Sequence, residues 1–148
     1  MQWLTAVIIN VLLLAMPAAE PIKTPQAWDA KSIHWQKTDA DGTKWAVLEG
    51  QSDVPNEAFT YAAFIPAGFH DFHSHTSDAR VAVVKGVLKI SFGEKLDLDH
   101  LKSYPVGSFL YVPADVKHTM AADEDTIIIG TAVGPWHTHH TEDPQHHQ

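Results

Sequence analysis

The chain has 148 residues, no cysteine and a formal net charge of −8, from 10 basic and 18 acidic residues. This length fits one domain that buries a core without covalent staples. The absence of cysteine excludes disulfides, cysteine–zinc sites and thiol catalysis. The acidic balance argues against nucleic acid as a partner, because phosphates bind to Lys and Arg patches. The anomaly is the presence of 11 histidines.

The segment 1–19 has the pattern of a secretory signal peptide. Its apolar run, residues 4–15, is shorter than the roughly 20 residues that span a bilayer, and small residues follow it. We therefore expect an exported protein, periplasmic or secreted, with no stable membrane span after cleavage. The run is not preceded by Lys or Arg, which leaves an uncleaved membrane anchor as the alternative.

Residues 20–43 are predicted to be an N-terminal linker followed by an edge strand. Prolines and weak periodicity mark residues 20–31 as the linker, with Trp28 as its anchor to the domain. Residues 32–37 and 44–49 are strand-like and flank a turn rich in Asp and Gly.

Short strand-like runs continue along the rest of the chain, separated by Gly, Pro and Asp. This spacing predicts an all-β sandwich or barrel. A single short helix is expected near residues 96–102. The further predicted strands are residues 58–65, 80–85, 87–92, 107–112 and 126–133.

The C-terminal residues 137–148 have no hydrophobic period and are expected to be disordered. They are rich in histidine, so weak metal binding and a merely solvated end are both open readings. The histidines of this tail are His137, His139, His140, His146 and His147.

Three histidines in the centre of the chain form a candidate metal site. His73 and His75 are two residues apart, and on an extended chain their side chains share one face. His118 follows a predicted strand that ends at Pro113. Neutral imidazoles bind zinc, copper, iron and nickel, so the trio predicts a divalent transition metal as cofactor.

The spacing of these residues resembles the two motifs of the cupin superfamily, and in particular small single-domain bacterial cupins of unassigned function. The motif-one positions fall on Gly68, His73, His75 and Gly86, and the motif-two positions on Gly107, Pro113 and His118. The resemblance implies a cupin jelly-roll barrel (double-stranded β-helix) over residues 44–136. It also implies His73, His75 and His118 as ligands of Zn, Fe, Mn, Ni or Cu, and a homodimer as a candidate assembly.

The chain departs from the cupin pattern at three positions. Ala79 stands where the motif-one glutamate falls, and Asp115 and Ala122 stand at the motif-two Gly and Asn. Loss of the glutamate removes one negative charge from the metal's ligands. Three histidines still make a workable set with open positions, so we expect weaker affinity and room for water or a ligand oxygen.

Asp78 and His70 are two further candidates for the site. Asp78 neighbours the missing glutamate, but strand alternation places residues 73, 75, 77 and 79 on one face and turns Asp78 away. His70 lies in an irregular segment and is expected at the cavity rim. No catalytic base is apparent, so the catalytic residues remain unassigned.

A barrel of this size holds one small ligand. Three functions follow: an exported metal-binding module, a metal-dependent oxygenase or isomerase acting on a small organic substrate, and a metal-free ligand-binding or structural cupin. Arg80, by its parity, is expected to point to the surface. The expected cavity wall consists of Phe64, Phe69, Phe72, Phe109, Tyr111, Met120 and the inward residues of 81–84.

Overall fold

The computed structural model describes residues 24–29 and 31–141. In these residues the chain consists of strands joined by turns and loops, and no helix occurs among them. The strands are β1 (Lys37–Thr38), β2 (Lys44–Glu49), β3 (Ala58–Ile65), β4 (His70–His75), β5 (Ala79–Lys85), β6 (Val87–Phe92), β7 (Lys102–Pro105), β8 (Phe109–Val112), β9 (His118–Ala121), β10 (Thr126–Val133) and β11 (Thr138–His140).

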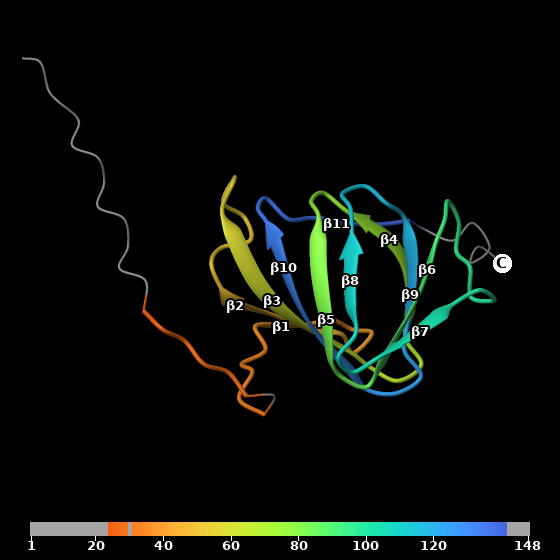
Figure 1. Cartoon of the computed structure of the whole chain (residues 1–148), viewed down its shortest axis with the longest axis horizontal. Helices are drawn as coiled ribbons and strands as arrows, with labels where there is room; N and C mark the ends of the chain where they lie inside the picture. The colour runs from red at the N-terminus through yellow and green to blue at the C-terminus, as the bar shows by residue number, and fades with distance from the viewer. Residues whose placement is uncertain (1–23, 30, 142–148) are drawn as a thin grey trace, which may run out of the picture.

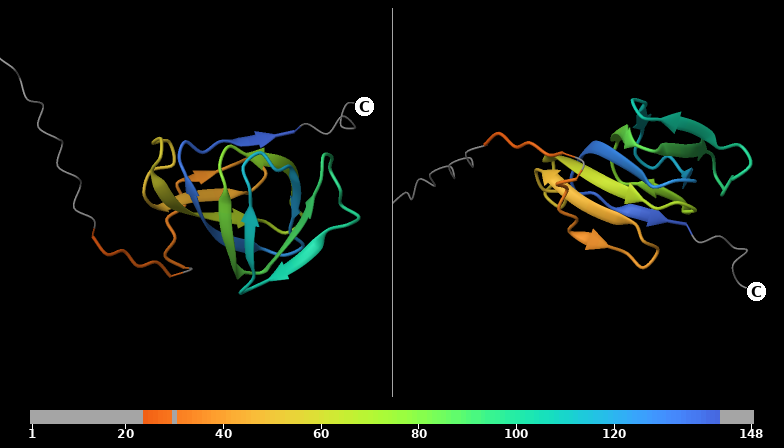
Figure 2. Two further views of the ribbon diagram at one scale, coloured as in Figure 1. Left: turned by 45° about the horizontal axis from the view of Figure 1, so that its top comes forward. Right: turned by 90° about the horizontal axis from the view of Figure 1, so that it is seen from below.

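The strands form two antiparallel sheets that face each other (Figures 1 and 2). The six-stranded sheet has the order β1-β2-β3-β10-β5-β8, and the five-stranded sheet has the order β11-β4-β9-β6-β7. Strands distant in sequence are therefore neighbours in space, as β3 and β10 are. The all-β jelly-roll prediction is confirmed, and the predicted bounds of β2, β3, β6 and β10 match those observed.

The main core lies between the two sheets and follows strand alternation. On β5, Ala79, Val81 and Val83 are buried while Arg80 is exposed. Apolar side chains from both sheets complete this core. Its buried members are Ile65, Ala79, Val81, Val83, Leu88, Ile90, Leu110, Val112, Ala122 and Ile128.

The N-terminal segment covers the outer face of the larger sheet. Ile33 is buried against Ala46, Leu48 and neighbouring residues. Trp35 packs edge-on against Phe64, with ring centroids 6.2 Å apart. The expected anchor, Trp28, is 46 % exposed and does not hold the segment. Ile33 and Trp35 do so because they reach an apolar patch on the outer face.

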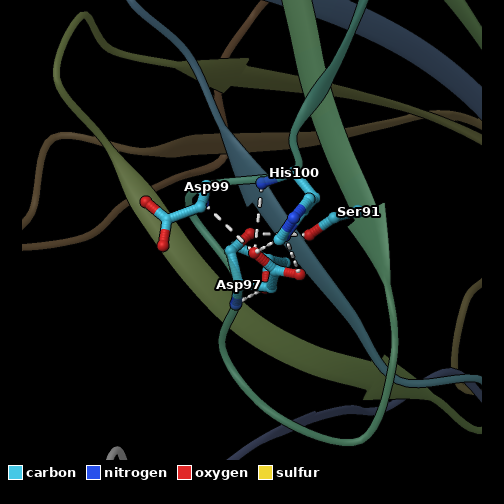
Figure 3. Close-up of polar contacts among 5 residues, drawn as sticks. Ser91, Asp97, Asp99 and His100 are labelled. Carbon is cyan, nitrogen blue, oxygen red and sulfur yellow. Dashed lines mark hydrogen bonds and ion pairs between the residues drawn. The ribbon is translucent and has the colours of Figure 1, made fainter.

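The loop between β6 and β7 covers the outer face of the smaller sheet, and the helix expected near residues 96–102 is absent there (Figure 3). The Asp97 carboxylate accepts hydrogen bonds from the backbone N–H groups of Asp99 and His100. Such local bonds offer the backbone an alternative to a helix. Thr119 Oγ1 accepts from Asp97 N, and Ser91 Oγ donates to Asp97 O, which ties the loop to β9 and β6.

Two glycines are required by close approach. Gly86, in the turn between β5 and β6, has a φ of 72°, and a Cβ there would lie 2.6 Å from Thr126 Oγ1. Gly130, on β10, lies against the ring of Tyr61, and a Cβ there would overlap the Cζ and Oη atoms of that ring. These glycines allow a tight turn and seat an aromatic ring on the neighbouring strand.

The C-terminal end of the described chain differs from the sequence-based expectation. Residues 137–148 were expected to be disordered, but Thr138–His140 form β11, which pairs with β4 at the sheet edge (Figure 2). Main-chain bonds hold this strand, and Thr141 N donates to Phe72 O at 3.0 Å. An edge strand held in this way needs no hydrophobic period.

Two predictions for the ends of the chain concern residues that the structure does not describe. The signal peptide expected at residues 1–19 is one, and the last part of the tail, 142–148, is the other. Nothing in the part of the chain that the structure describes is a helix capable of crossing a membrane.

Candidate metal centre

The pairing of β4 with β9 brings the three predicted histidines together. The register places His73 directly opposite His118, and His75 follows on the same face of β4. The imidazole centroids lie 4.3 Å apart for His73 and His118, 4.8 Å for His73 and His75, and 5.1 Å for His75 and His118. Each ring offers one nitrogen within 4.8 Å of the other two.

A turn before β9 sets the position of His118. Asp115 N donates to His75 O at 2.8 Å, which fastens the turn to the end of β4. Asp115 has a φ of 62°, in the left-handed region that Asp tolerates better than most residues. This residue stands where the motif-two glycine was expected, and it adopts a conformation suited to glycine.

The nitrogens of the trio are buried and incompletely partnered. The Nδ1 atoms of His73 and His75 are buried and make no hydrogen bond of acceptable geometry. His118 Nδ1 lies 3.0 Å from Val116 O and donates a hydrogen bond to that carbonyl. The lone pair of the neutral ring is therefore on Nε2, which is free to bind a metal. Buried polar atoms without partners are rare in folded proteins, and one of these two, His73 Nδ1, lies 2.9 Å from Asp71 Oδ2.

The surroundings of His75 and His118 favour the neutral form of these two rings. Burial, together with the nearby His73 and His118, lowers the pKa of His75 to about 2. Burial and the neighbouring His73 likewise lower the pKa of His118 to about 4. A metal ligand must be deprotonated, so both imidazoles are ready to bind at neutral pH without releasing a proton.

A second group of donors adjoins the first and was missed by the sequence analysis. Asp71 Oδ2 lies 2.9 Å from His73 Nδ1 and 2.8 Å from His140 Nδ1. Burial by itself would raise the pKa of Asp71, but the contacts with His73 and His140 outweigh it and lower the pKa to about 2. The sequence did contain a sign of this group: Asp71 and His73 are two residues apart on one strand, so their side chains lie on the same face. His140 could not be found while its segment was assigned to a disordered tail.

The trio lines a cavity of about 590 Å³. Aromatic side chains form part of its wall: Trp136 stacks on His75, and Trp45 stacks on Tyr61 with ring centroids 4.3 Å apart. Charged residues of the β1–β2 hairpin, among them Lys44, also line it. The donor set is three imidazoles facing a space that can admit a further ligand, which fits a divalent transition metal.

The sequence of this chain matches the model of one known protein family, described as the ChrR cupin-like domain, over residues 23–137. The chain belongs to this cupin family. A search of curated proteins found no match. The cupin identification agrees with the two-sheet barrel and with the grouping of the three histidines.

Solved cupin structures share the fold at low sequence identity. A cupin-like protein from Thermotoga maritima has a TM-score of 0.60 and 19% identity, covering 79% of this chain and 93% of its own. Salicylate 1,2-dioxygenase from Pseudoaminobacter salicylatoxidans, in complex with gentisate, has a TM-score of 0.58 and 15% identity, covering 72% and 31%. A chain in the Rhodobacter sphaeroides complex of SigE with the anti-sigma ChrR has a TM-score of 0.53 and 19% identity, covering 72% and 52%.

This cupin differs from the expected motif inside the cavity at Ala79. The Ala79 side chain is fully buried and lines the same cavity as the trio. The strand parity that placed residue 79 on the face of the histidines therefore agrees with the structure. No carboxylate reaches the site from this position, because alanine ends at Cβ.

The two further candidates lie apart from the trio. Asp78 accepts hydrogen bonds from Tyr111 Oη at 2.7 Å and from Ala114 N at 2.9 Å. The Ala114 and Tyr111 bonds lower the pKa of Asp78 below its usual range. His70, at the start of β4, is exposed and does not line the cavity. Neither residue belongs to a donor group with the three histidines among the described residues.

The predicted cavity wall is partly right. Phe64, Phe69 and Met120 line the cavity together with Val81. Three other aromatics do not: Phe72 is buried on the opposite face of β4, and Phe109 and Tyr111 are exposed. Arg80 points outward as predicted, and its guanidinium lies over the Tyr111 ring at 5.1 Å.

Proposed function

We propose that this cupin binds one divalent transition metal through His73, His75 and His118. The observation that carries the proposal is the convergence of three imidazoles, two buried and that of His75 half-buried, whose donor atoms lie within 4.8 Å of one another. Burying polar nitrogens without partners is costly. A metal ion would give each of the three rings a partner at the nitrogen that faces the centre. The candidates are Zn, Fe, Ni and Cu, which imidazole ligands suit, and Mn, which prefers oxygen ligands and would rely on the open positions.

Different residues of the chain would have different roles at this centre. The three histidines would hold the ion, and Val116 O would keep His118 in the tautomer that frees Nε2. The apolar wall would limit the access of water. A bound ion of this kind supplies a Lewis acid with positions open to a ligand.

Metal content tests the proposal directly. The chain would be purified without a tag, ended after Thr141, and analysed by elemental mass spectrometry. Ending it after Thr141 keeps β11, with His140, and removes His146 and His147, which could bind metal on their own. We expect about one metal per chain and its loss in the double variant His73→Ala/His75→Ala.

A matched control separates the site from general histidine binding. His34→Ala and His100→Ala remove two exposed histidines that lie outside the cavity, and both variants should retain the metal. The proposal fails if the chain binds no metal after reconstitution. The remaining reading would then be a metal-free cupin that binds a small ligand or serves as a structural module.

A metal-dependent enzyme is the second candidate, and the cavity favours it. The space beside the trio measures about 590 Å³, enough for a small organic molecule. A salicylate 1,2-dioxygenase, solved in one case in complex with gentisate, shares the fold. Oxygen uptake by the metal-loaded chain with salicylate or gentisate, absent in His118→Ala, would support an oxygenase. Metal binding without uptake favours a binding module.

Export is proposed from residues 1–19 alone, which carry the apolar run and the small residues of a signal peptide. Expression of the full-length chain, followed by N-terminal sequencing of the periplasmic and membrane fractions, tests it. We expect a periplasmic product that begins near Glu20. An uncut product in the membrane fraction would support the anchor alternative.

A further inference from the structure

Asp71 occupies a position from which it can act on the metal centre without binding the ion. Its Oδ2 atom lies 2.9 Å from Nδ1 of His73, whose side chain is only 5 % exposed. The Asp71 side chain is itself mostly buried, at 21 % exposed, and it lines the cavity. Asp71 lies in a donor group with His73 and His140, and not in the group of the three proposed ligands.

The contact is at Nδ1 of His73, so Nε2 is the nitrogen that would remain for a metal at the trio. A neutral imidazole carries one N–H donor and one lone pair. With its proton on Nδ1, beside the Asp71 carboxylate, His73 presents the Nε2 lone pair to the centre. His118 is held in this way, because its Nδ1 donates to Val116 O. His73 Nδ1 lies 2.9 Å from the Asp71 carboxylate without the alignment of a full hydrogen bond. A carboxylate in this position also raises the basicity of the ligand.

The charge of Asp71 bears on the absence of the motif-one glutamate. Three neutral histidines leave the double positive charge of a divalent ion without compensation inside the cavity. Ala79 supplies none. Asp71 places one negative charge directly behind a ligand, where low-dielectric surroundings make it effective.

We propose that Asp71 is a positioning residue of the metal centre: it holds the Nδ1 proton of His73, so that Nε2 faces the ion, and supplies the negative charge that Ala79 lacks. This inference rests on the proposed metal binding. The same carboxylate also contacts the exposed His140 of β11 at 2.8 Å. A purely structural role, in which Asp71 pins β11 to β4, is therefore the rival explanation.

The tautomer of His73 can be observed in the unmutated chain. Long-range ¹H–¹⁵N correlation spectra at pH 7.5 distinguish a ring protonated on Nδ1 from one protonated on Nε2. We expect the Nδ1–H form for His73, and on addition of ¹¹³Cd²⁺ a coupling to its Nε2. An Nε2–H form, or coupling through Nδ1, overturns the inference.

Variants separate the positioning role from the structural one, with Co²⁺ as the probe. We expect Asp71→Asn to weaken Co²⁺ binding about 10- to 100-fold and to shift the d–d absorption bands. Asp71→Glu, which keeps the carboxylate, should recover part of the affinity. His140→Ala removes the link to β11 and should leave affinity and spectrum nearly unchanged.

Two results would overturn the role of Asp71 while leaving metal binding intact. One is an Asp71→Asn variant with the parent's affinity and spectrum. The other is an equal loss in Asp71→Asn and His140→Ala, which assigns the effect to β11. If the parent binds no Co²⁺, both the inference and the proposed function fail. Near-ultraviolet circular dichroism of each variant checks its fold, and the tautomer measurement decides the matter if Asp71→Asn does not fold.

Discussion

The indole ring of Trp136 stacks on the imidazole of His75, with ring centroids 4.3 Å apart and an angle of 27° between the planes. Trp136 immediately precedes the segment that leads into β11, and it also packs near Tyr61 and Trp45. The stack restricts the orientation of the His75 ring. It also places a fluorescent side chain next to one proposed ligand.

Trp136 should therefore report metal binding. Addition of Co²⁺ or Cu²⁺ is expected to quench tryptophan emission, because a paramagnetic ion at His75 lies close to the indole. Trp136→Phe should lose most of the quenching while Trp28→Phe, which alters an exposed tryptophan, retains it. Equal quenching in all three proteins would mean that Trp136 is not the reporter of the ion.

Restoring a carboxylate at position 79 should strengthen metal binding. Ala79→Glu adds a negative donor on the strand face that lines the cavity, and we expect the Kd to fall at least about tenfold, or ~1.4 kcal/mol. The apo form should lose roughly 1–3 kcal/mol, because the new carboxylate is buried without a partner. Isothermal titration and urea unfolding measure the two effects.

Ala82→Glu is the matched control for that prediction. Ala82 lies on the same strand but outside the cavity lining. The same substitution there should leave the metal affinity unchanged. A similar gain in affinity in both variants would mean that long-range charge, and not a ligand at position 79, is responsible.

The apo protein should lose stability as the pH falls below about 6.5. The pKa of His75 is lowered from 6.5 to about 2, and that of His118 from 6.5 to about 4, chiefly by burial. Between the unfolded pKa of 6.5 and the lowered pKa in the folded chain, each of these histidines binds a proton in the unfolded chain but not in the folded chain. Stability is therefore complete above pH 6.5 and declines as pH falls. Both histidines contribute to the decline from pH 6.5, His118 down to about pH 4 and His75 down to about pH 2.

Urea unfolding of the metal-free chain at several pH values measures this slope. Each of the two histidines contributes at most about 1.4 kcal/mol per pH unit. His75→Asn/His118→Asn should flatten the profile between pH 6 and about 4. His34→Asn changes an exposed histidine and should not alter it. A wild-type profile that is flat over this range contradicts the burial of neutral rings.

Gly130 should tolerate no side chain. A methyl group there would overlap the Tyr61 ring on the neighbouring strand, so Gly130→Ala is expected to cost about 1–3 kcal/mol. Gly93→Ala is the control, because a Cβ at Gly93 meets no atom within 4 Å. Thermal or urea unfolding compares the two. Equal stability of both variants would mean that Tyr61 can move aside at little cost.

The sequence by itself determined the all-β class, the bounds of several strands and the identity of the three histidines. Two-residue alternation placed His73, His75 and Ala79 on one face, because side chains on a strand alternate whatever the rest of the chain does. Parity likewise turned Asp78 and Arg80 outward. These features depend only on the local geometry of a strand, which can be read from the spacing of residues close together in the sequence.

Only the tertiary structure decided which distant segments meet. The contact between Asp71 and His140 joins residues 69 positions apart, through an edge strand whose polar sequence suggested disorder. The helix expected near residues 96–102 gave way to a loop, because the Asp97 side chain and the outer face of a sheet offered other hydrogen bonds. Main-chain pairing at a sheet edge and side-chain hydrogen bonds to a loop produce no hydrophobic periodicity in the sequence. Such contacts can therefore be recognised only in the assembled sheets.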